Sequence, residues 1–154
     1  MRSIYLSLAF LFLFVGCKDA APAAATEAAP AEKAAPAPAE SDPAPISEIS
    51  VEDADKAIQS GALAFDANSE RTRKKNGTVP DAVILSSSSK YDLAQLPEDK
   101  SKDMIFYCSN TRCTASESAA ERASSNGYEN VHIMREGIKG WKEAGKATTA
   151  YPRS

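Results

Sequence analysis

Short apolar runs alternate with polar segments through the chain from residue 46 onward. Four runs of aliphatic, aromatic and β-branched residues have the length of buried strands, at residues 62–65, 82–85, 104–107 and 131–134. Residues 47–49 are expected to add a short edge strand. The segment between the first two runs carries Gly77 and Pro80, so we predict it as a loop.

Helix signals fill most of the other gaps. Ser50, with Asp53 three residues later, is typical of a helix start, and Gly61 and Gly127 are typical of helix ends. The predicted helices span residues 50–59, 91–96, 114–126 and 138–144. Strands that alternate with helices favour an α/β fold, with a mainly parallel sheet covered by helices on both faces. We assign residues 46–154 to one such domain.

Two side chains that are candidates for chemistry, a carboxylate and a thiol, follow directly after predicted strands. Asp66 follows the first apolar run, and Cys108 follows the run at residues 104–107. In open parallel sheets, ligands bind at the carboxyl ends of the strands, near a switch in strand order. We therefore expect Asp66 and Cys108 to lie at the functional edge of the sheet.

The first 16 residues differ from the rest. Arg2 precedes an apolar run over residues 4–16, which is shorter than the roughly 18 residues that span a bilayer. A basic start and a short apolar core predict an export signal. Phe14-Val15-Gly16-Cys17 resembles the cleavage site of bacterial lipoproteins, which makes Cys17 the expected lipidated residue. The alternative is an ordinary secretory signal with an incidental cysteine.

Residues 17–45 are rich in Ala, Pro and Glu and contain no aromatic residue. Such a segment buries too little apolar surface to offset the loss of chain entropy, so we predict a disordered tether. Its prolines favour an extended spacer. The chain is then expected to be exported and held by a lipid anchor at the bacterial cell envelope, with the periplasmic side as its location.

The amino-acid composition limits the kinds of partner that we expect. The net charge is -3 and a quarter of the residues are charged, without a basic stripe. This balance gives no reason to expect nucleic acid as a partner. Membrane contact is expected only through the lipid anchor.

Cys108 is the strongest candidate for chemistry. It stands between a predicted strand and a predicted helix, whose N-terminus offers unpaired N–H donors and a partial positive charge. We expect the backbone N–H groups of residues 109–113 to converge on its sulfur and to lower its pKa. The thiolate would then act as the nucleophile. Arg112 adds a positive charge that would attract a small anionic substrate; the alternative is a solvated surface arginine.

Several motifs follow one another in the order seen in rhodanese-like domains. They are Asp66, Gly77-Thr78-Val79-Pro80-Asp81-Ala82, Tyr107-Cys108, Gly127-Tyr128-Glu129-Asn130-Val131 and Gly137-Ile138-Lys139-Gly140-Trp141. The resemblance covers roughly residues 46–152. It implies that Cys108 carries sulfane sulfur as a persulfide, taken from thiosulfate or a persulfide and passed to a thiol acceptor, without a cofactor or metal. The implied active-site loop comprises Ser109, Asn110, Thr111, Arg112, Cys113 and Thr114, with Asp66 in support.

The chain departs from the family pattern at several positions. Thr111 replaces a glycine common in the middle of the loop, and Cys113 stands where an arginine is common. The further departures are Asn68 for an arginine, Thr78 for a histidine, Asp81 for a glycine and Glu136 for a glycine. They concern the substrate rather than the fold.

Cys113 is the most informative of these departures. Two cysteines five residues apart on one loop are able to pair, and an exported protein permits a disulfide. Cys113 would then resolve a persulfide or sulfenic acid on Cys108 in a redox cycle. The alternative is that Cys113 packs as a small hydrophobic residue. A redox or non-catalytic binding module is therefore the second functional hypothesis.

Other cysteine chemistries fit less well. A phosphatase loop needs an arginine at its far end, but Arg112 is too close to Cys108 and Arg122 falls within the predicted helix. A cysteine–histidine hydrolase needs a base, and His132, the one histidine, lies within a predicted strand. The cysteine and histidine spacing is unlike that of zinc sites, so no metal is expected.

Overall fold

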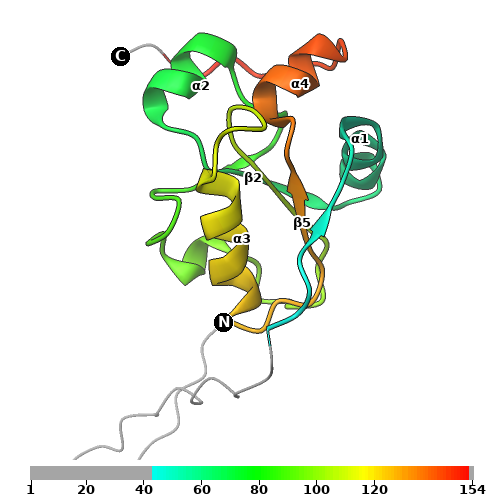
Figure 1. The fold of residues 1–154 in the computed structure, drawn as a ribbon, viewed down its shortest axis with the longest axis vertical. Coiled ribbons are helices and arrows are strands. Elements are labelled where there is room, and N and C mark those ends of the chain that lie inside the picture. Colours follow the sequence, from blue (N-terminus) through cyan, green and yellow to red (C-terminus); the bar gives the residue numbers. More distant parts are fainter. Residues whose placement is uncertain (1–42, 153–154) are drawn as a thin grey trace, which may run out of the picture. The chain divides into compact units, whose positions relative to one another are not determined.

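The computed structural model describes residues 43–152 of the 154-residue chain (Figure 1). The predicted export signal, Cys17 and nearly all of the predicted tether lie outside the described residues. In the described part, no helix is both long enough and apolar enough to cross a membrane.

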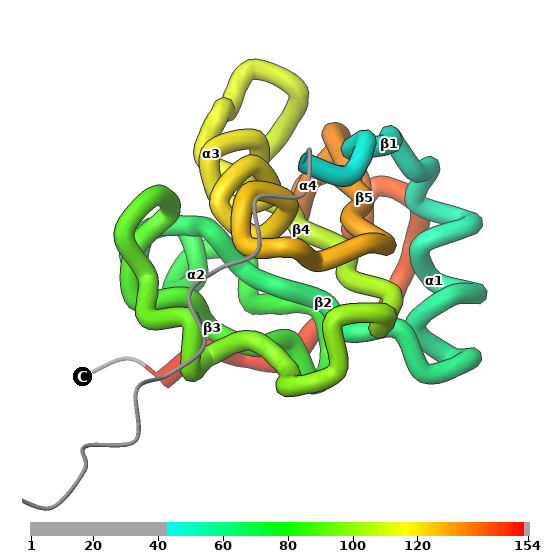
Figure 2. Tube along the Cα trace, turned by 90° about the horizontal axis from the view of Figure 1, so that it is seen from below, coloured from blue at the N-terminus to red at the C-terminus, as the bar shows by residue number. Residues whose placement is uncertain are grey.

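A five-stranded parallel sheet lies at the centre of the domain (Figures 1 and 2). Its strands are β1 (Ser47–Glu48), β2 (Leu63–Asp66), β3 (Val83–Ile84), β4 (Met104–Tyr107) and β5 (Val131–Met134). Their order in space is β1-β5-β4-β2-β3, so the chain goes outward from β2 to β3 and then crosses back to β4. Tyr107 pairs with Asp66 on one side and Met134 on the other, which places the ends of β2, β4 and β5 at one edge.

Helices cover both faces of this sheet, as predicted. They are α1 (Val51–Gln59), α2 (Glu70–Asn76), α3 (Ala115–Ser124) and α4 (Gly137–Glu143), with a 3-10 helix at Leu93–Gln95. Side chains alternate along β4, so Met104 and Phe106 join a core with α3, while Ile105 and Tyr107 join a core with α1 and α4. Figure 2 shows α3 and α1 on opposite sides of the strands.

The predicted strands all exist, and β4 and β5 have the predicted bounds. The prediction of a continuous loop after β2 is wrong, because α2 occupies residues 70–76. This helix shows no apolar periodicity, but its capping signals are present in the sequence. The Ser69 side chain accepts the N–H of Thr72, and Gly77 ends the helix with φ +76°. The predicted helix at residues 91–96 is one 3-10 turn.

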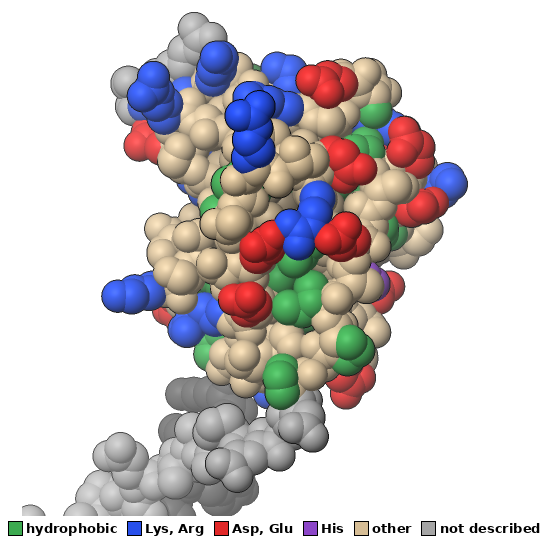
Figure 3. All heavy atoms as spheres, viewed as in Figure 1, with side chains coloured by type: hydrophobic (Ala, Val, Ile, Leu, Met, Phe, Trp, Pro, Cys, Tyr) green, Lys and Arg blue, Asp and Glu red, His purple; other side chains and the backbone are tan. Residues whose placement is uncertain are grey.

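Charged side chains of both signs occupy the face of the molecule drawn in Figure 3. Arg135, just after β5, forms ion pairs with Glu48 of β1 and Glu117 of α3. These contacts connect the edge strand, the central sheet and a covering helix. Because Arg135 is more than a third exposed, solvent screens both pairs and their contribution to stability is small.

Candidate active site

Cys108 follows β4 directly and begins the loop that leads into α3. Helix α4 holds this loop from the other side, since the N–H of Ile138 donates to the carbonyl of Cys108 at 2.9 Å and that of Lys139 to Ser109 at 3.2 Å. Gly137 permits this approach, because a Cβ there would lie 2.4 Å from the Cys108 carbonyl oxygen. The loop backbone is therefore positioned by a helix far away in the sequence.

The Cys108 sulfur is buried in polar surroundings. The residue is 1% exposed, and its thiol donates to the carbonyl oxygen of Cys113 at 3.0 Å and more distantly to that of Asn110 at 3.8 Å. The Ser116 hydroxyl donates to the sulfur at 3.4 Å. Carbonyl acceptors favour the protonated thiol, whereas the Ser116 hydroxyl favours the thiolate.

The expectation of a lowered pKa at Cys108 is therefore wrong for this arrangement. Burial raises the pKa of the Cys108 thiol, and its interaction with Cys113 raises it further, against the hydroxyl and N–H of Ser116. The expected ring of loop N–H groups is also not formed. The N–H groups of Arg112 and Cys113 instead donate to the side chain and the carbonyl of Asn110, because the loop closes as a tight turn.

Cys113 has the opposite character. It is half-buried, and both thiols are free rather than joined in a disulfide. Partial burial disfavours its thiolate, but hydrogen bonds with the Cys108 thiol and from the N–H groups of Ser109 and Ala115 outweigh this and lower the pKa of Cys113. The Cys108 thiol reaches the backbone carbonyl of Cys113 at 3.0 Å, so the two residues are neighbours. A disulfide or a resolving role for the pair stays a prediction.

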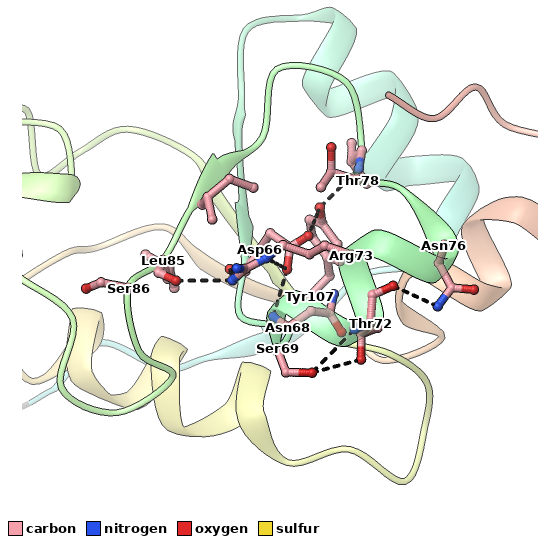
Figure 4. Close-up of polar contacts among 12 residues, drawn as sticks. Asp66, Asn68, Ser69, Thr72, Arg73, Asn76, Thr78, Leu85, Ser86 and Tyr107 are labelled. Carbon is pink, nitrogen blue, oxygen red and sulfur yellow. Dashed lines mark hydrogen bonds and ion pairs between the residues drawn. The ribbon is translucent and has the colours of Figure 1, made fainter. Parts of the chain in front are cut away.

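Asp66 organises the strand ends next to this loop (Figure 4). Its fully buried carboxylate accepts the N–H of Asn68 at 2.7 Å, the Tyr107 hydroxyl at 2.8 Å and the guanidinium of Arg73 at 3.2 Å. Arg73 also donates to the carbonyl of Leu85 at 3.1 Å. Asp66 thus supports its own turn, α2 and β3, and reaches the cysteine loop only through Tyr107.

The phenol of Tyr107 completes this network. It accepts the N–H of Val79 at 3.0 Å while donating to Asp66. Burial and then the Asp66 carboxylate raise the pKa of Tyr107 well above its usual range, so the hydroxyl stays protonated as a hydrogen-bond donor. The network joins β2, β4 and α2 to the loop that carries Val79 and to Leu85, just after β3.

A pocket of about 670 Å³ opens between α2, the segment after β3 and the cysteine loop. We call it the Asn68 pocket. Its lining residues are Ala67, Asn68, Ser69, Glu70, Thr72, Arg73, Ile84, Leu85, Ser86, Ser87, Ser88, Ser109, Cys113, Ala115 and Tyr151. Cys113 is the thiol that reaches this pocket, and Cys108 lies behind it.

The remaining predicted loop residues face elsewhere. Asn110, Thr111 and Arg112 line a different hollow of about 300 Å³, together with Glu136 and Lys139 of the α4 region. Arg112 therefore lies apart from the Asn68 pocket. Thr114 precedes α3 without a side-chain capping bond.

The residues considered for other chemistries are also accounted for. Arg122 donates to the carbonyl of Tyr91 at 3.1 Å and lies over its ring, so it is not part of the cysteine loop. His132 hydrogen-bonds with Ser47 at 2.6 Å across β5 and β1. Neither residue is placed to act on Cys108.

Sequence reasoning missed two residues that shape the site. Ser116, at 1% exposure, supplies the hydroxyl at the Cys108 sulfur, and its place in the first turn of a helix after the cysteine was the available signal. Arg73 is one of several basic residues in a polar segment, so nothing local distinguished it. Asn68 was noted only as a departure, although it lines the pocket.

Comparison with known proteins gives a consistent result. The family model of the rhodanese-like domain matches residues 50–144. The rhodanese-like domain of an Anabaena protein is 20% identical, with a TM-score of 0.55 over 68% of this chain and 79% of that one. A rhodanese-related protein from Thermoplasma volcanium is 18% identical, with a TM-score of 0.52 over 68% and 99%.

A protein from Rhodopseudomonas palustris, described as a possible tyrosine phosphatase, is 20% identical, with a TM-score of 0.55 over 67% of this chain and 84% of that one. No curated protein matches the chain. At these identities the solved structures establish the fold alone.

Proposed function

This chain belongs to the rhodanese-like domain family, and we propose that it transfers sulfane sulfur through a persulfide on Cys108. One observation carries the proposal. Cys108 lies at the carboxyl end of the central strand β4, with the Ser116 hydroxyl at its sulfur and a second thiol beside it. This is the position at which an open parallel sheet presents reactive groups.

The reaction has two displacement steps. The Cys108 thiolate attacks the outer sulfur of thiosulfate or a persulfide; a new S–S bond forms and sulfite or a thiolate leaves. An acceptor thiolate then attacks the sulfane sulfur of the Cys108 persulfide and regenerates the Cys108 thiolate. Neither step needs a cofactor or metal, because no net electron transfer to the protein occurs. Since Cys108 is 1% exposed, residues 109–113 must shift before its sulfur meets an acceptor.

A second candidate function is thiol–disulfide exchange by the cysteine pair. The turn that brings the Cys108 sulfur within 3.0 Å of the Cys113 carbonyl favours it, because it makes the two cysteines neighbours on one loop. In that reaction an external disulfide is reduced to two thiols while the pair is oxidised.

The proposed location of the protein follows from its N-terminal sequence. We place the domain outside the cytoplasm, on a tether that is lipid-anchored through Cys17. Its partners are then a small sulfur donor and a thiol acceptor of that compartment, with the membrane contacted only through the anchor and nucleic acid playing no part. Labelling with a radioactive or clickable fatty acid, with Cys17→Ser as control, tests the anchor.

Intact-mass analysis after incubation with a sulfur donor tests the proposed transfer. We expect purified protein treated with thiosulfate or glutathione persulfide to gain one sulfur, and cyanide to remove it as thiocyanate. Cys108→Ser should form thiocyanate much more slowly than wild type. If wild type and Cys108→Ser release equal amounts with both donors, the transferase proposal is wrong. Closure of a disulfide without sulfur gain would instead select the redox function.

A further inference from the structure

Only one of the two thiols is accessible from the Asn68 pocket. Cys113 lines the pocket together with Ser109 and Ala115, while Cys108 lies behind it and is 1% exposed. The thiol of Cys108 points to the carbonyl of Cys113 at 3.0 Å. A molecule that enters the pocket therefore meets the Cys113 sulfur before that of Cys108.

Asn68 supplies an independent sign that the pocket takes a ligand. The residue is 5% exposed, yet its side-chain Oδ1 and Nδ2 are buried and have no hydrogen-bond partner. Its backbone N–H is already bound to Asp66 at 2.7 Å. A buried, unpaired carboxamide destabilises a fold, so native proteins rarely keep one without a reason. A ligand that both donates and accepts hydrogen bonds would satisfy it once the side chain turns into the pocket that Asn68 lines.

The charges around the pocket indicate what kind of ligand fits. Among the described residues that line it, the charged ones are Glu70 and Arg73. Arg73 is bound to Asp66 and to the carbonyl of Leu85, and Glu70 pairs with Lys74 at 2.8 Å. The rest of the polar lining is made of hydroxyl and amide groups, including Ser86, Ser87 and Ser88. This lining suits an uncharged polar molecule better than a dianion such as thiosulfate.

We propose that Cys113 is the entry thiol of the site, and that the Asn68 pocket presents to it an uncharged, amide-bearing persulfide or disulfide whose amide pairs with the Asn68 side chain. The lowered pKa of Cys113 supports this order of reaction. The proposal rests on the sulfur chemistry proposed above and names both the substrate class and the first nucleophile.

The reaction needs no added oxidant, because the sulfur that is transferred is already at the sulfane or disulfide level. The Cys113 thiolate attacks the outer sulfur of R–S–SH; the new bond joins Cys113 to that sulfur, and R–S⁻ leaves and takes a proton from water. Cys108 then attacks the same outer sulfur, giving a Cys108 persulfide, and its proton passes to Cys113. With a disulfide R–S–S–R, Cys113 forms a mixed disulfide and releases one thiol, and Cys108 closes the internal disulfide and releases the other.

Trapping with the symmetric disulfide of N-acetylcysteine amide tests the order of attack. In purified full-length protein, Cys108→Ser should react as fast as wild type and accumulate a mixed disulfide mapped to Cys113. Cys113→Ser should react at least about tenfold more slowly, because its remaining thiol is buried. Equal rates for Cys113→Ser and wild type, or a first adduct on Cys108, would overturn the proposal.

Substitution of Asn68 tests the pocket itself. Asn68→Leu should slow the reaction with the amide disulfide by about fivefold, the effect of losing one or two hydrogen bonds to the ligand. Its reaction with methyl methanethiosulfonate, which lacks an amide, should be unchanged. The melting temperature should stay equal or rise, because the Asn68 side chain has no partner to lose. Asn126→Leu, just past the C-terminal end of α3, is a control for the loss of an amide away from the pocket and should leave both rates unchanged.

The results separate this inference from the proposed function. A drop in melting temperature for Asn68→Leu, or equal slowing with both reagents, would mean that Asn68 has a structural role. Either result would refute the proposal that its side chain binds the amide of a ligand. Fast thiocyanate formation in Cys113→Ser with the persulfide of N-acetylcysteine amide would refute entry at Cys113 while leaving transfer at Cys108 intact. A Cys113 adduct with no thiocyanate from any variant would refute the transferase and keep Cys113 as the entry thiol.

Discussion

At the scale of single residues, the surroundings of a sulfur atom decide what a cysteine does. Cys108 and Cys113 share one short loop, yet the first is fully buried against backbone carbonyls and the second receives N–H groups at the edge of a pocket. The pKa of Cys108 is raised and that of Cys113 lowered. The two thiols therefore differ in exposure and in how readily each loses its proton.

The pH dependence of alkylation follows from these directions. A thiol with a lowered pKa stays ionised to lower pH than an ordinary thiol. For each pH unit below its pKa, the ionised fraction falls about tenfold. We predict that the rate at which iodoacetamide modifies Cys113 in Cys108→Ser rises with pH, and that the pH at its midpoint lies below that of a free cysteine. In Cys113→Ser, modification of Cys108 should be slow, with a midpoint above it.

The variant Cys108→Ala provides the control for this prediction. Alanine removes the hydrogen bond that the Cys108 side chain gives to Cys113, whereas serine keeps a hydroxyl donor. The midpoint for Cys113 should therefore be higher in Cys108→Ala than in Cys108→Ser. Identical midpoints in both variants would contradict the role assigned to the neighbouring thiol.

At the scale of secondary-structure elements, α4 positions the cysteine loop although it follows β5 in the chain. Its first N–H groups bind the carbonyls of Cys108 and Ser109, and Gly137 makes room for their approach. Helix α2 acts similarly on the other wall, where Arg73 ties it to Asp66 and Leu85. The site is thus built from loops that separate elements hold in place.

We predict that Gly137→Ala lowers the free energy of unfolding by about 3 kcal/mol, from left-handed backbone strain at φ +61° and collision with the loop. Cysteine alkylation rates should change as well, because the loop must move. Gly145→Ala has the same strain at φ +72° but meets nothing within 4 Å, so it should cost only about 1 kcal/mol. Urea unfolding of both variants measures the difference, and equal losses would contradict the collision.

At the scale of the whole described domain, the last residues brace α2. Thr149 and Thr78 exchange two backbone hydrogen bonds of 2.9 Å, and the ring of Tyr151 lies under the guanidinium of Arg73. The indole of Trp141 donates to the carbonyl of Ala147 at 2.7 Å. The end of the chain therefore closes one side of the Asn68 pocket.

Truncation after Ala147 should lower the free energy of unfolding by about 2 kcal/mol, since it removes the two backbone bonds and the Tyr151 contact. Alkylation of Cys113 should accelerate, because Tyr151 no longer shields the pocket. Truncation after Pro152 leaves these contacts in place and is the control. Faster unfolding without a change at Cys113 would show that the brace does not reach the pocket.

Local patterns in the sequence were sufficient for the framework of this protein. Within residues 43–152, apolar runs and capping residues located all five strands and three of the four α-helices, because strand and helix periodicity are properties of neighbouring residues. The order of motifs identified the family and the end of β4 as the place of Cys108. The polar helix α2 could not be predicted from apolar periodicity, because hydrogen bonds of Arg73 rather than an apolar stripe hold it against the sheet.

Only the tertiary structure decided what the cysteine loop presents. Whether loop N–H groups turn toward the Cys108 sulfur or toward Asn110 depends on backbone torsions that α4 and Gly137 impose from a distant part of the chain. In the folded chain Cys108 is buried, Cys113 lines the Asn68 pocket and the Asn68 amide has no hydrogen-bond partner. Hydrogen bonding and burial are set by groups close in space rather than in sequence, so the identity of the first-reacting thiol is a property of the folded chain.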